Sequence, residues 1–358
     1  MIAYIFRKLI YAILVLWGVV TLVFFLFNVL PGDPARMMLG QREDSNQLAI
    51  IKQKYAFDRS VTEQYFLYLN DISPISLHHN SDDAYTSLQS DKYNFISLCL
   101  VFNYNLAIKL PYLRESFVRV GTPVSVILVK TFVNTLVLAS TSIFFALSLG
   151  LVLGVFSALY KDSLIDKLIL FFSVLGMSLP SFFSAILIAW FFGFYLHKYT
   201  GLNMTGNLYE IDDYGRGYFF QMKNLILPAL TLGIRPLSVI IQLCRNSMLE
   251  VFSMDYIRTA TAKGLSKFLV IFKHALRNAL NPVITAVSGW FASMLAGAVF
   301  VEYIFAWNGI GKEIVDALNR MDLPVVMGSV LLIAFIFVII NIIVDLVYGW
   351  LDPRIRFS

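Results

Sequence analysis

Glycine and lysine residues that resemble part of a phosphate-binding loop lie near position 310. Gly309, Gly311 and Lys312 stand close together there. A nucleotide-binding phosphate loop also needs an earlier glycine at a fixed distance and a serine or threonine after the lysine. Here Glu313 follows the lysine and the earlier glycine is missing. We therefore expect that this chain does not bind ATP by itself.

Metal chemistry has equally little support. The four histidines (His78, His79, His197 and His274) fall in three different loops, and none belongs to a His-Glu-x-x-His pattern. His78 and His79 could touch a metal, but an adjacent pair in a polar loop is more often simply solvated. The sequence therefore predicts no metal site, no cofactor and no membrane metalloprotease.

Charges deep in apolar segments would mark an ion path or a proton relay. Lys130, Arg235, Glu302 and Asp345 are the candidates, and we interpret them as lying at or near the ends of apolar runs, where side chains reach the interface. An ion-coupled secondary transporter therefore stays a less favoured alternative. An intramembrane enzyme would need convergent acid, base or metal-binding residues at depth, and the sequence offers none.

The composition places most of these residues in lipid. Of the 358 residues 58% are apolar and 14% are charged, whereas soluble domains spend about a quarter of their residues on charge. Apolar runs of the roughly 20 residues needed to cross a bilayer recur along the chain. We predict an all-α polytopic membrane protein with six transmembrane helices. These span Leu9–Leu30, Thr131–Leu159, Leu168–Leu196, Leu225–Leu243, Pro282–Val301 and Val325–Val347.

The distribution of basic residues orients these spans. With the amino end inside, the cytoplasmic side carries 12 basic residues and the short outer loops carry five, which favours both termini in the cytoplasm. The basic residues lie between apolar runs, so the net charge of +5 indicates contact with membrane lipid and not with nucleic acid. We expect three regions: a signal-anchor helix (1–30), a periplasmic segment with a long insertion (31–125), and a core of five transmembrane helices (126–358).

Two features of the spans predict how the helices pack. Small residues recur every four positions in the second span (Ala146, Gly150, Gly154, Ala158) and in the fifth (Gly289, Ser293, Gly297). Such faces allow close helix contact in lipid, so both helices are expected inside a bundle. Pro180 removes an internal hydrogen bond from the third span and should kink it, either as a fixed bend or as a hinge.

The predicted cytoplasmic loop, residues 253–281, is the most specific part of the sequence. A short helix is expected to open near Asp255 and to stop at Gly264, because glycine readily adopts the left-handed conformation that ends helices. Ser266 can then cap a second helix. Ala260 and Ala262 are small and would let another protein approach closely.

Residues 255–265 of this loop resemble the EAA motif of permease subunits of ABC importers, in the version found in the dipeptide, oligopeptide and nickel permease family. Other family-like segments follow in the same order, and together they carry the resemblance. They are Pro31–Pro34, Ser178–Phe182, Leu227–Leu232, Val301–Phe305, Gly309–Gly311, Asn341–Asp345 and Leu351–Arg356. The resemblance covers roughly residues 1–70 and 110–358, and the segment from Ile72 to Leu110 is longer than is usual for the family.

The resemblance implies a type I ABC importer permease-like bundle in the bacterial inner membrane. Its partners would be a second permease subunit, two ABC ATPase subunits and a periplasmic or lipoprotein substrate-binding protein. The chain would be a transport subunit and not an enzyme, since a separate chain hydrolyses ATP. Its substrates would be di- and oligopeptides or related small solutes, with nickel chelates as an alternative. Whether the second permease is a sister chain or a copy stays open.

The resemblance also suggests two sites. The first couples the chain to the ATPase, and its candidate residues are Asp255, Arg258, Ala260, Ala262, Lys263 and Gly264. The second is an outer gate or a contact for the binding protein, with plain loop structure as an equal alternative. Its candidate residues are Glu302, Tyr303, Phe305, Asn308, Gly309 and Gly311.

Overall fold

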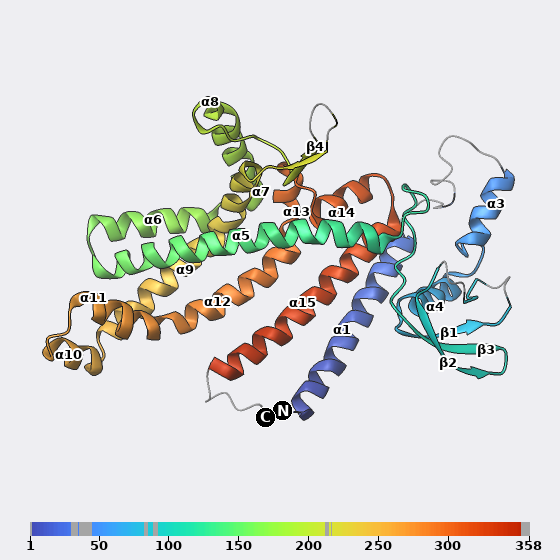
Figure 1. Cartoon of the computed structure of the whole chain (residues 1–358), viewed down its shortest axis with the longest axis horizontal. Helices are drawn as coiled ribbons and strands as arrows, with labels where there is room; N and C mark the ends of the chain where they lie inside the picture. Colours follow the sequence, from blue (N-terminus) through green and yellow to red (C-terminus); the bar gives the residue numbers. More distant parts are fainter. Residues whose placement is uncertain are drawn as a thin grey trace. The chain divides into compact units, whose positions relative to one another are not determined.

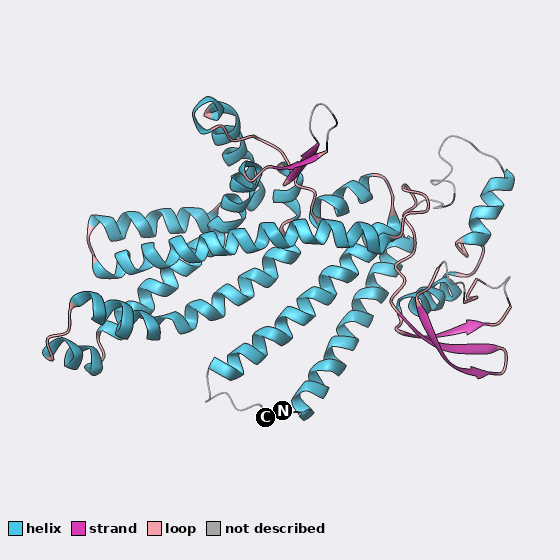
Figure 2. Cartoon of the chain, in the orientation of Figure 1, coloured by secondary structure: helices cyan, strands magenta, loops and turns pink. Residues whose placement is uncertain are grey.

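The computed structural model describes residues 2–29, 35, 45–81, 85–88, 92–211, 215 and 217–351. Two of the family-like segments, residues 31–34 and 352–356, lie outside this range. The chain divides into two compact units, residues 1–130 with 313–335 and residues 131–312 with 336–358. Helices dominate the described residues, and the strands form one three-stranded sheet and one two-stranded hairpin (Figure 2).

The first unit combines an apolar amino-terminal helix with a small α/β region. Its elements are α1 (Ile2–Val29), α3 (Ser45–Lys54), α4 (Val61–Ile72), β1 (Ile75–His79), β2 (Phe95–Val101) and β3 (Tyr104–Lys109), followed by the start of α5 (Val124–Leu159), most of α14 (Ile310–Asn319) and the first part of α15 (Leu323–Leu351). Phe24 of α1 packs on Tyr65 and Tyr68 of α4, which ties the helix to this region.

The segment from Ile72 to Leu110 forms an antiparallel sheet in the order β1-β3-β2. A buried carboxylate, Asp71, organises the residues around this sheet. Tyr93 Oη donates to Asp71 Oδ1 at 2.9 Å, Arg114 Nε donates to Asp71 Oδ2 at 3.0 Å, and Lys109 Nζ donates to the Asp71 carbonyl oxygen. These contacts make the described residues of this segment a small folded region.

The second unit holds most of the long helices (Figure 1). After the rest of α5 come α6 (Leu164–Ser178), α7 (Ser181–Ile188), a π-helical segment η1 (Ala189–Tyr195), α8 (His197–Thr200), β4 (Tyr209–Ile211), β5 (Tyr218–Phe220), α9 (Lys223–Phe252), α10 (Asp255–Ala262), α11 (Lys267–Leu269), a second π-helical segment η2 (Val270–Ala275), α12 (Leu276–Gly297) and α13 (Val299–Ile304). Helix α9 packs against α6 and α12.

Within the described residues, four single helices are long and apolar enough to cross a membrane, and a fifth candidate is the bent pair of α6 with the segment Ser181–Tyr195. The single helices cover Phe6–Phe27, Val124–Leu159, Lys223–Phe252 and Leu323–Val344. The predicted fifth span corresponds largely to α12, which is not among these helices. The chain is thus a helical, multi-pass membrane protein.

The small-residue face of the second span packs as predicted. A β-carbon on Gly150 would lie 2.7 Å from Ile240 Cγ2, and one on Gly154 would lie 2.7 Å from Cys244 Cβ. Only glycine lets α5 and α9 approach this closely. Helix α12, which holds most of the fifth span, packs against α9, but two residues of its small-residue face make no such contact: Gly289 meets no atom within 4 Å and Ser293 is exposed.

Pro180 has a larger effect than the predicted kink. Helix α6 ends at Ser178, a new helix begins at Ser181, and the axes of the two segments differ by 110°. Proline has no N–H to continue the hydrogen-bond ladder, so the helix ends and a new one starts there.

The interpretation of Arg235 as a residue near a span end is also wrong, because α9 continues from Lys223 to Phe252 and Arg235 lies well inside it.

A buried ion pair joins α6 to α9. Asp166, at the start of α6, accepts hydrogen bonds from Arg245 Nε and Nη2, both at 2.7 Å. The two side chains are 3% and 15% exposed, respectively. Ser157 Oγ and the Asp162 N–H also donate to this carboxylate, so its charge is fully compensated.

We predict that Arg245→Met lowers the free energy of unfolding by about 3–5 kcal/mol, because it leaves a buried carboxylate without its cation. The measurement is thermal or denaturant unfolding of the purified protein in detergent. The control is the double variant Asp166→Asn/Arg245→Met, which removes both charges and should lose clearly less stability. Equal losses for the single and the double variant would contradict this assignment.

Candidate functional site

The two predicted sites lie at opposite ends of the same helices in the second unit. Helix α9 ends at Phe252 and leads into α10, and α12 then runs back to α13 (Figure 1). The loop of residues 253–281 therefore lies at one end of α9 and α12, and the segment of residues 299–311 lies at the other. If α9 crosses the membrane, the two sites face different compartments.

Helix α10 has the form that the sequence predicts. It begins at Asp255 and ends at Ala262, and Gly264 has a φ of +76°. The N–H of Lys263 donates to the Thr259 carbonyl at 3.0 Å, and the N–H of Gly264 donates to the Thr261 carbonyl at 3.0 Å. These bonds satisfy the last carbonyls of the helix, as left-handed glycine caps do.

The predicted coupling residues divide between two faces of α10. Ile257 and Ala260 are buried in a cluster that includes Met248 of α9 and Val270 of η2. The other predicted residues are exposed: Asp255, Arg258, Ala262, Lys263 and Gly264. Asp255 Oδ1 and Arg258 Nη1 lie 3.7 Å apart. The small size of Ala260 therefore serves packing within the chain, and of the two alanines only Ala262 is exposed.

A side-chain hydrogen bond adds to this packing. Asn278 Nδ2 on α12 donates to Tyr256 Oη at 2.8 Å, and it also lies 3.0 Å from the His274 carbonyl oxygen. Ser266 caps the next helix, since its hydroxyl accepts from the Leu269 N–H at 3.4 Å. Helix α10 is thus braced against α9 and α12 and presents one polar face outward.

Glu302 organises the opposite end of the unit. Its side chain is fully buried. Oε1 accepts from Thr135 Oγ1 at 2.6 Å, and Oε2 accepts from the N–H of Gly311 at 2.6 Å and of Lys312 at 3.2 Å. The last two groups lie in the first turn of α14, where a carboxylate is favoured by the free N–H groups and by the helix dipole.

Two glycines make room for this carboxylate. A β-carbon on Gly309 would lie 2.2 Å from Glu302 Oε1, and one on Gly311 would lie 2.4 Å from Val299 Cα. Neither position accepts a larger residue without moving the Glu302 side chain or the backbone of α13. Thr135 Oγ1 also accepts from the Ile310 N–H at 2.9 Å, so α5, α13 and α14 meet at one buried polar cluster.

The neighbouring loop is fixed in the same way. Trp307 Nε1 donates to the Asn134 carbonyl at 3.1 Å, and Asn134 Nδ2 donates to the Asn308 carbonyl at 2.8 Å. Trp307 and Phe305 are each 1% exposed. Of the predicted outer-site residues, only Tyr303 and Asn308 are exposed. Glu302 is buried, so the interpretation of this residue as an interfacial anchor is wrong.

Within the described residues, no group of three or more histidine, cysteine, aspartate or glutamate side chains is placed to hold a metal ion.

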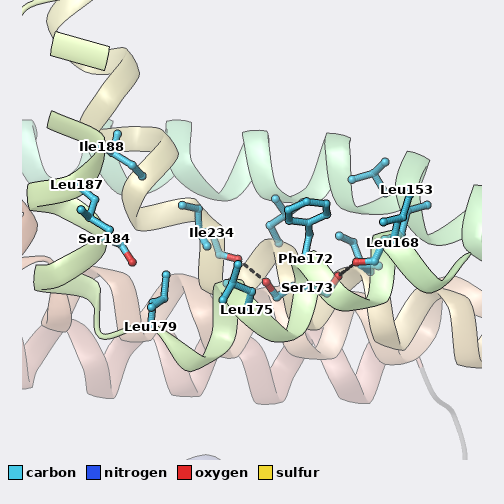
Figure 3. Close-up of a pocket in the computed structure, with 15 residues that line it drawn as sticks. Leu153, Leu168, Phe172, Ser173, Leu175, Leu179, Ser184, Leu187, Ile188 and Ile234 are labelled. Atoms are coloured by element: carbon cyan, nitrogen blue, oxygen red, sulfur yellow. Dashed lines mark hydrogen bonds between the residues drawn. The ribbon is translucent and has the colours of Figure 1, made fainter. Parts of the chain in front are cut away.

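Two pockets lie beside the helix break at Pro180. The larger, of about 510 Å³, is lined almost wholly by apolar side chains of α5, α6, α7 and α9, and it offers no charged group (Figure 3). The smaller, of about 170 Å³, has a mixed polar and apolar lining that includes Arg235.

Comparison with known families identifies the kind of protein that carries these features. The family described as "Binding-protein-dependent transport system inner membrane component" matches residues 150–357, and its amino-terminal counterpart matches residues 1–82. The chain belongs to this permease family. Both matches agree with the resemblance found in the sequence, and together they make the chain a membrane subunit of an ABC transport system and not an enzyme.

Relatives of this permease match it over its whole length. The dipeptide transport system permease protein DppB of Alkalihalophilus pseudofirmus is 33% identical, with all of both chains covered. The di/tripeptide transport system permease protein DppB of Pseudomonas aeruginosa is 33% identical over 99% of each chain. The glutathione transport system permease protein GsiC of Salmonella paratyphi A is 31% identical over the full length of both.

Sequence reasoning missed the partners of Glu302 and the setting of Arg235 in this permease. Thr135 lies 167 positions from Glu302, and no local pattern links the two. The Thr135 hydroxyl is buried and donates to Glu302. The signal that was available is the pair Gly309 and Gly311, since two closely spaced glycines near an acid often mark a close backbone approach.

We predict that Gly309→Ala and Glu302→Ala each loosen this loop. The first drives a methyl group into the carboxylate. The second leaves the Gly311 N–H without its acceptor, at a cost of about 1–3 kcal/mol for a buried group left unpaired. Limited proteolysis of the purified permease should show faster cleavage between residues 303 and 311.

Tyr303→Ala is the matched control, because Tyr303 lies on the same helix with a side chain that is 47% exposed. It should leave the cleavage rate close to that of the wild type. Faster cleavage in this control, or none in the other two variants, would show that the Glu302 contacts do not hold the loop.

Proposed function

We propose that this permease forms one half of the translocation pathway of an ATP-driven, binding-protein-dependent importer for di- and oligopeptides. The observation that carries the proposal is α10 with Gly264, a short helix that is braced on its inner face and exposed on its outer face. The names of its relatives support peptides as the substrate class, since those proteins are named as permeases for dipeptides, tripeptides and glutathione.

Six membrane crossings of a type I importer complete this proposal, with α12 as the fifth span. Both termini are cytoplasmic. The end of α9 that leads into α10 supports this orientation, because it carries a run of basic residues. They are Arg245, Arg258, Lys263, Lys267, Lys273 and Arg277. The segment around Glu302 then faces the periplasm, where Tyr303 and Asn308 are free to meet a binding protein.

The partners are a second permease subunit, two ATPase subunits on the cytoplasmic side and a substrate-binding protein outside. The outer face of α10 lies in a groove on an ATPase, which is a helix-in-groove contact. The inner face carries Ile257 and Ala260, and it packs on the ends of α9 and η2. Closure of the ATPases moves α10, and the attached helices follow because this contact is closely packed.

We predict that Gly264→Pro and Gly264→Glu reduce peptide-stimulated ATP hydrolysis and uptake by roughly tenfold or more, while membrane insertion stays intact. Gly264 has a φ of +76°, and a side chain there costs about 1–2 kcal/mol and changes the end of α10. The assay uses proteoliposomes that contain this chain, its companion permease, the ATPases and the binding protein.

Gly121→Glu is the matched control, because Gly121 has a φ of +77° and, like Gly264, no neighbouring atom within 4 Å of an added β-carbon. It should lose far less coupling than Gly264→Glu. Full coupling in Gly264→Glu would refute the role of this loop, and equal losses in both variants would reduce the effect to backbone strain.

We also predict that a cysteine at position 262 crosslinks to the ATPase and that a cysteine at position 260 does not. Ala262 is exposed and Ala260 is 7% exposed, and the two lie on the same helix. The background should carry Cys99→Ser and Cys244→Ala, which removes both native thiols. A crosslink from position 260 alone, or from neither position, would contradict the proposed contact surface.

A further inference from the structure

Arg235 is a charged residue in the interior of a membrane-spanning helix. It lies roughly 18 Å from the start of α9, at about 1.5 Å per residue, and the helix continues to Phe252. A charge at such depth is costly, so it faces a cavity or a partner in nearly all membrane proteins. Its surroundings therefore indicate what it is for.

Within the described part of the chain, the guanidinium of Arg235 has neither an ion pair nor a hydrogen bond. The contrast with Arg245 on the same helix is informative, because that guanidinium is fully engaged by Asp166. Arg235 instead lines the pocket of about 170 Å³ beside the break at Pro180. No acidic residue lines this pocket, so the cation is not neutralised from within it.

The hydroxyl groups around Arg235 are also unused. Ser181, Ser184 and Ser293 line the pocket, and their hydroxyls make no hydrogen bond to any described residue. Other hydroxyls in these helices donate to the carbonyl oxygen one turn back. Thr231 Oγ1 and Ser238 Oγ do so at 2.8 and 2.9 Å, respectively. Figure 3 places Ser184 beside Leu179 and Leu187 at one end of the adjoining apolar pocket.

The break in the third span adds a further source of positive potential. Helix α7 begins at Ser181, so the first N–H groups of its opening turn have no acceptor within the helix. Helix amino ends attract anions, and in secondary transporters the amino ends of broken helices often point at anionic substrate groups. Here the amino end, the free hydroxyls and the guanidinium all line one pocket.

We propose that this pocket binds a terminal carboxylate of the solute as it passes through the membrane, with Arg235 as its ion-pair partner and Ser181 and Ser293 as hydroxyl donors. The proposal rests on the function proposed above. Trp290 and Met294 supply apolar surface for the adjoining part of the solute. Arginine suits this role because its planar donors match the two oxygens of a carboxylate.

The test compares a photoreactive dipeptide, alanyl-p-benzoylphenylalanine, as the free acid and as the carboxyl-terminal amide. Each is irradiated with the assembled transporter in proteoliposomes, and the labelled positions are mapped by mass spectrometry. The free acid should label the region of Trp290 and Met294 about tenfold more than the amide does, as expected for loss of one charge-assisted contact. Arg235→Gln should lower labelling by the acid to the level of the amide, and Arg235→Lys should retain part of it.

Lys130→Gln is the matched control, because it removes an exposed positive charge from α5 at a residue that does not line the pocket. Its labelling should equal that of the wild type. Equal labelling by acid and amide in the wild type, or unchanged labelling in Arg235→Gln, would overturn the proposal. So would loss of a companion subunit from the Arg235→Gln complex, because Arg235 would then pair with an acid of a neighbouring chain.

ATP-driven uptake of an unmodified dipeptide by the same wild-type preparation separates the two proposals. Without any such uptake, the function proposed above fails. With uptake present and labelling indifferent to the carboxylate, only the role of this pocket fails.

Discussion

A membrane interior offers no water to satisfy polar groups, and this constraint accounts for most of the structure of the permease. Several buried polar side chains of the long helices are bound by other parts of the chain. The Asp166 and Arg245 pair joins α6 to α9, and the Glu302 carboxylate binds Thr135 and the start of α14. Against this background an unengaged guanidinium, that of Arg235, stands out as a functional group.

The two ends of the second unit differ in how much of their surface is exposed. At one end, α10 is a short helix whose buried residues hold it against α9 and η2 and whose other face is polar and open. At the other end, Glu302 and Trp307 are wholly enclosed and only a few side chains reach the surface. One end thus presents a whole polar helix face to its surroundings. The other is a fixed loop that offers a few separate contacts.

Local patterns in the sequence predicted those parts of the fold that depend on near neighbours. Gly264 ends a helix, Pro180 interrupts one, and the glycines of α5 permit a close contact, each for a reason contained in a few residues. Contacts between residues far apart in the sequence could not be predicted from local patterns. The surroundings of Arg235 depend on where α9 ends and on a helix break 55 positions earlier, and the partners of Glu302 depend on α5.

The contact between α5 and α9 limits how the permease can change shape. Gly150 and Gly154 lie so close to Ile240 and Cys244 that a β-carbon at either glycine would clash with the opposite side chain. This close packing favours movement of the two helices as one body. Opening and closing must be taken up at joints elsewhere, of which the interruption at Pro180 is the most pronounced in the described helices.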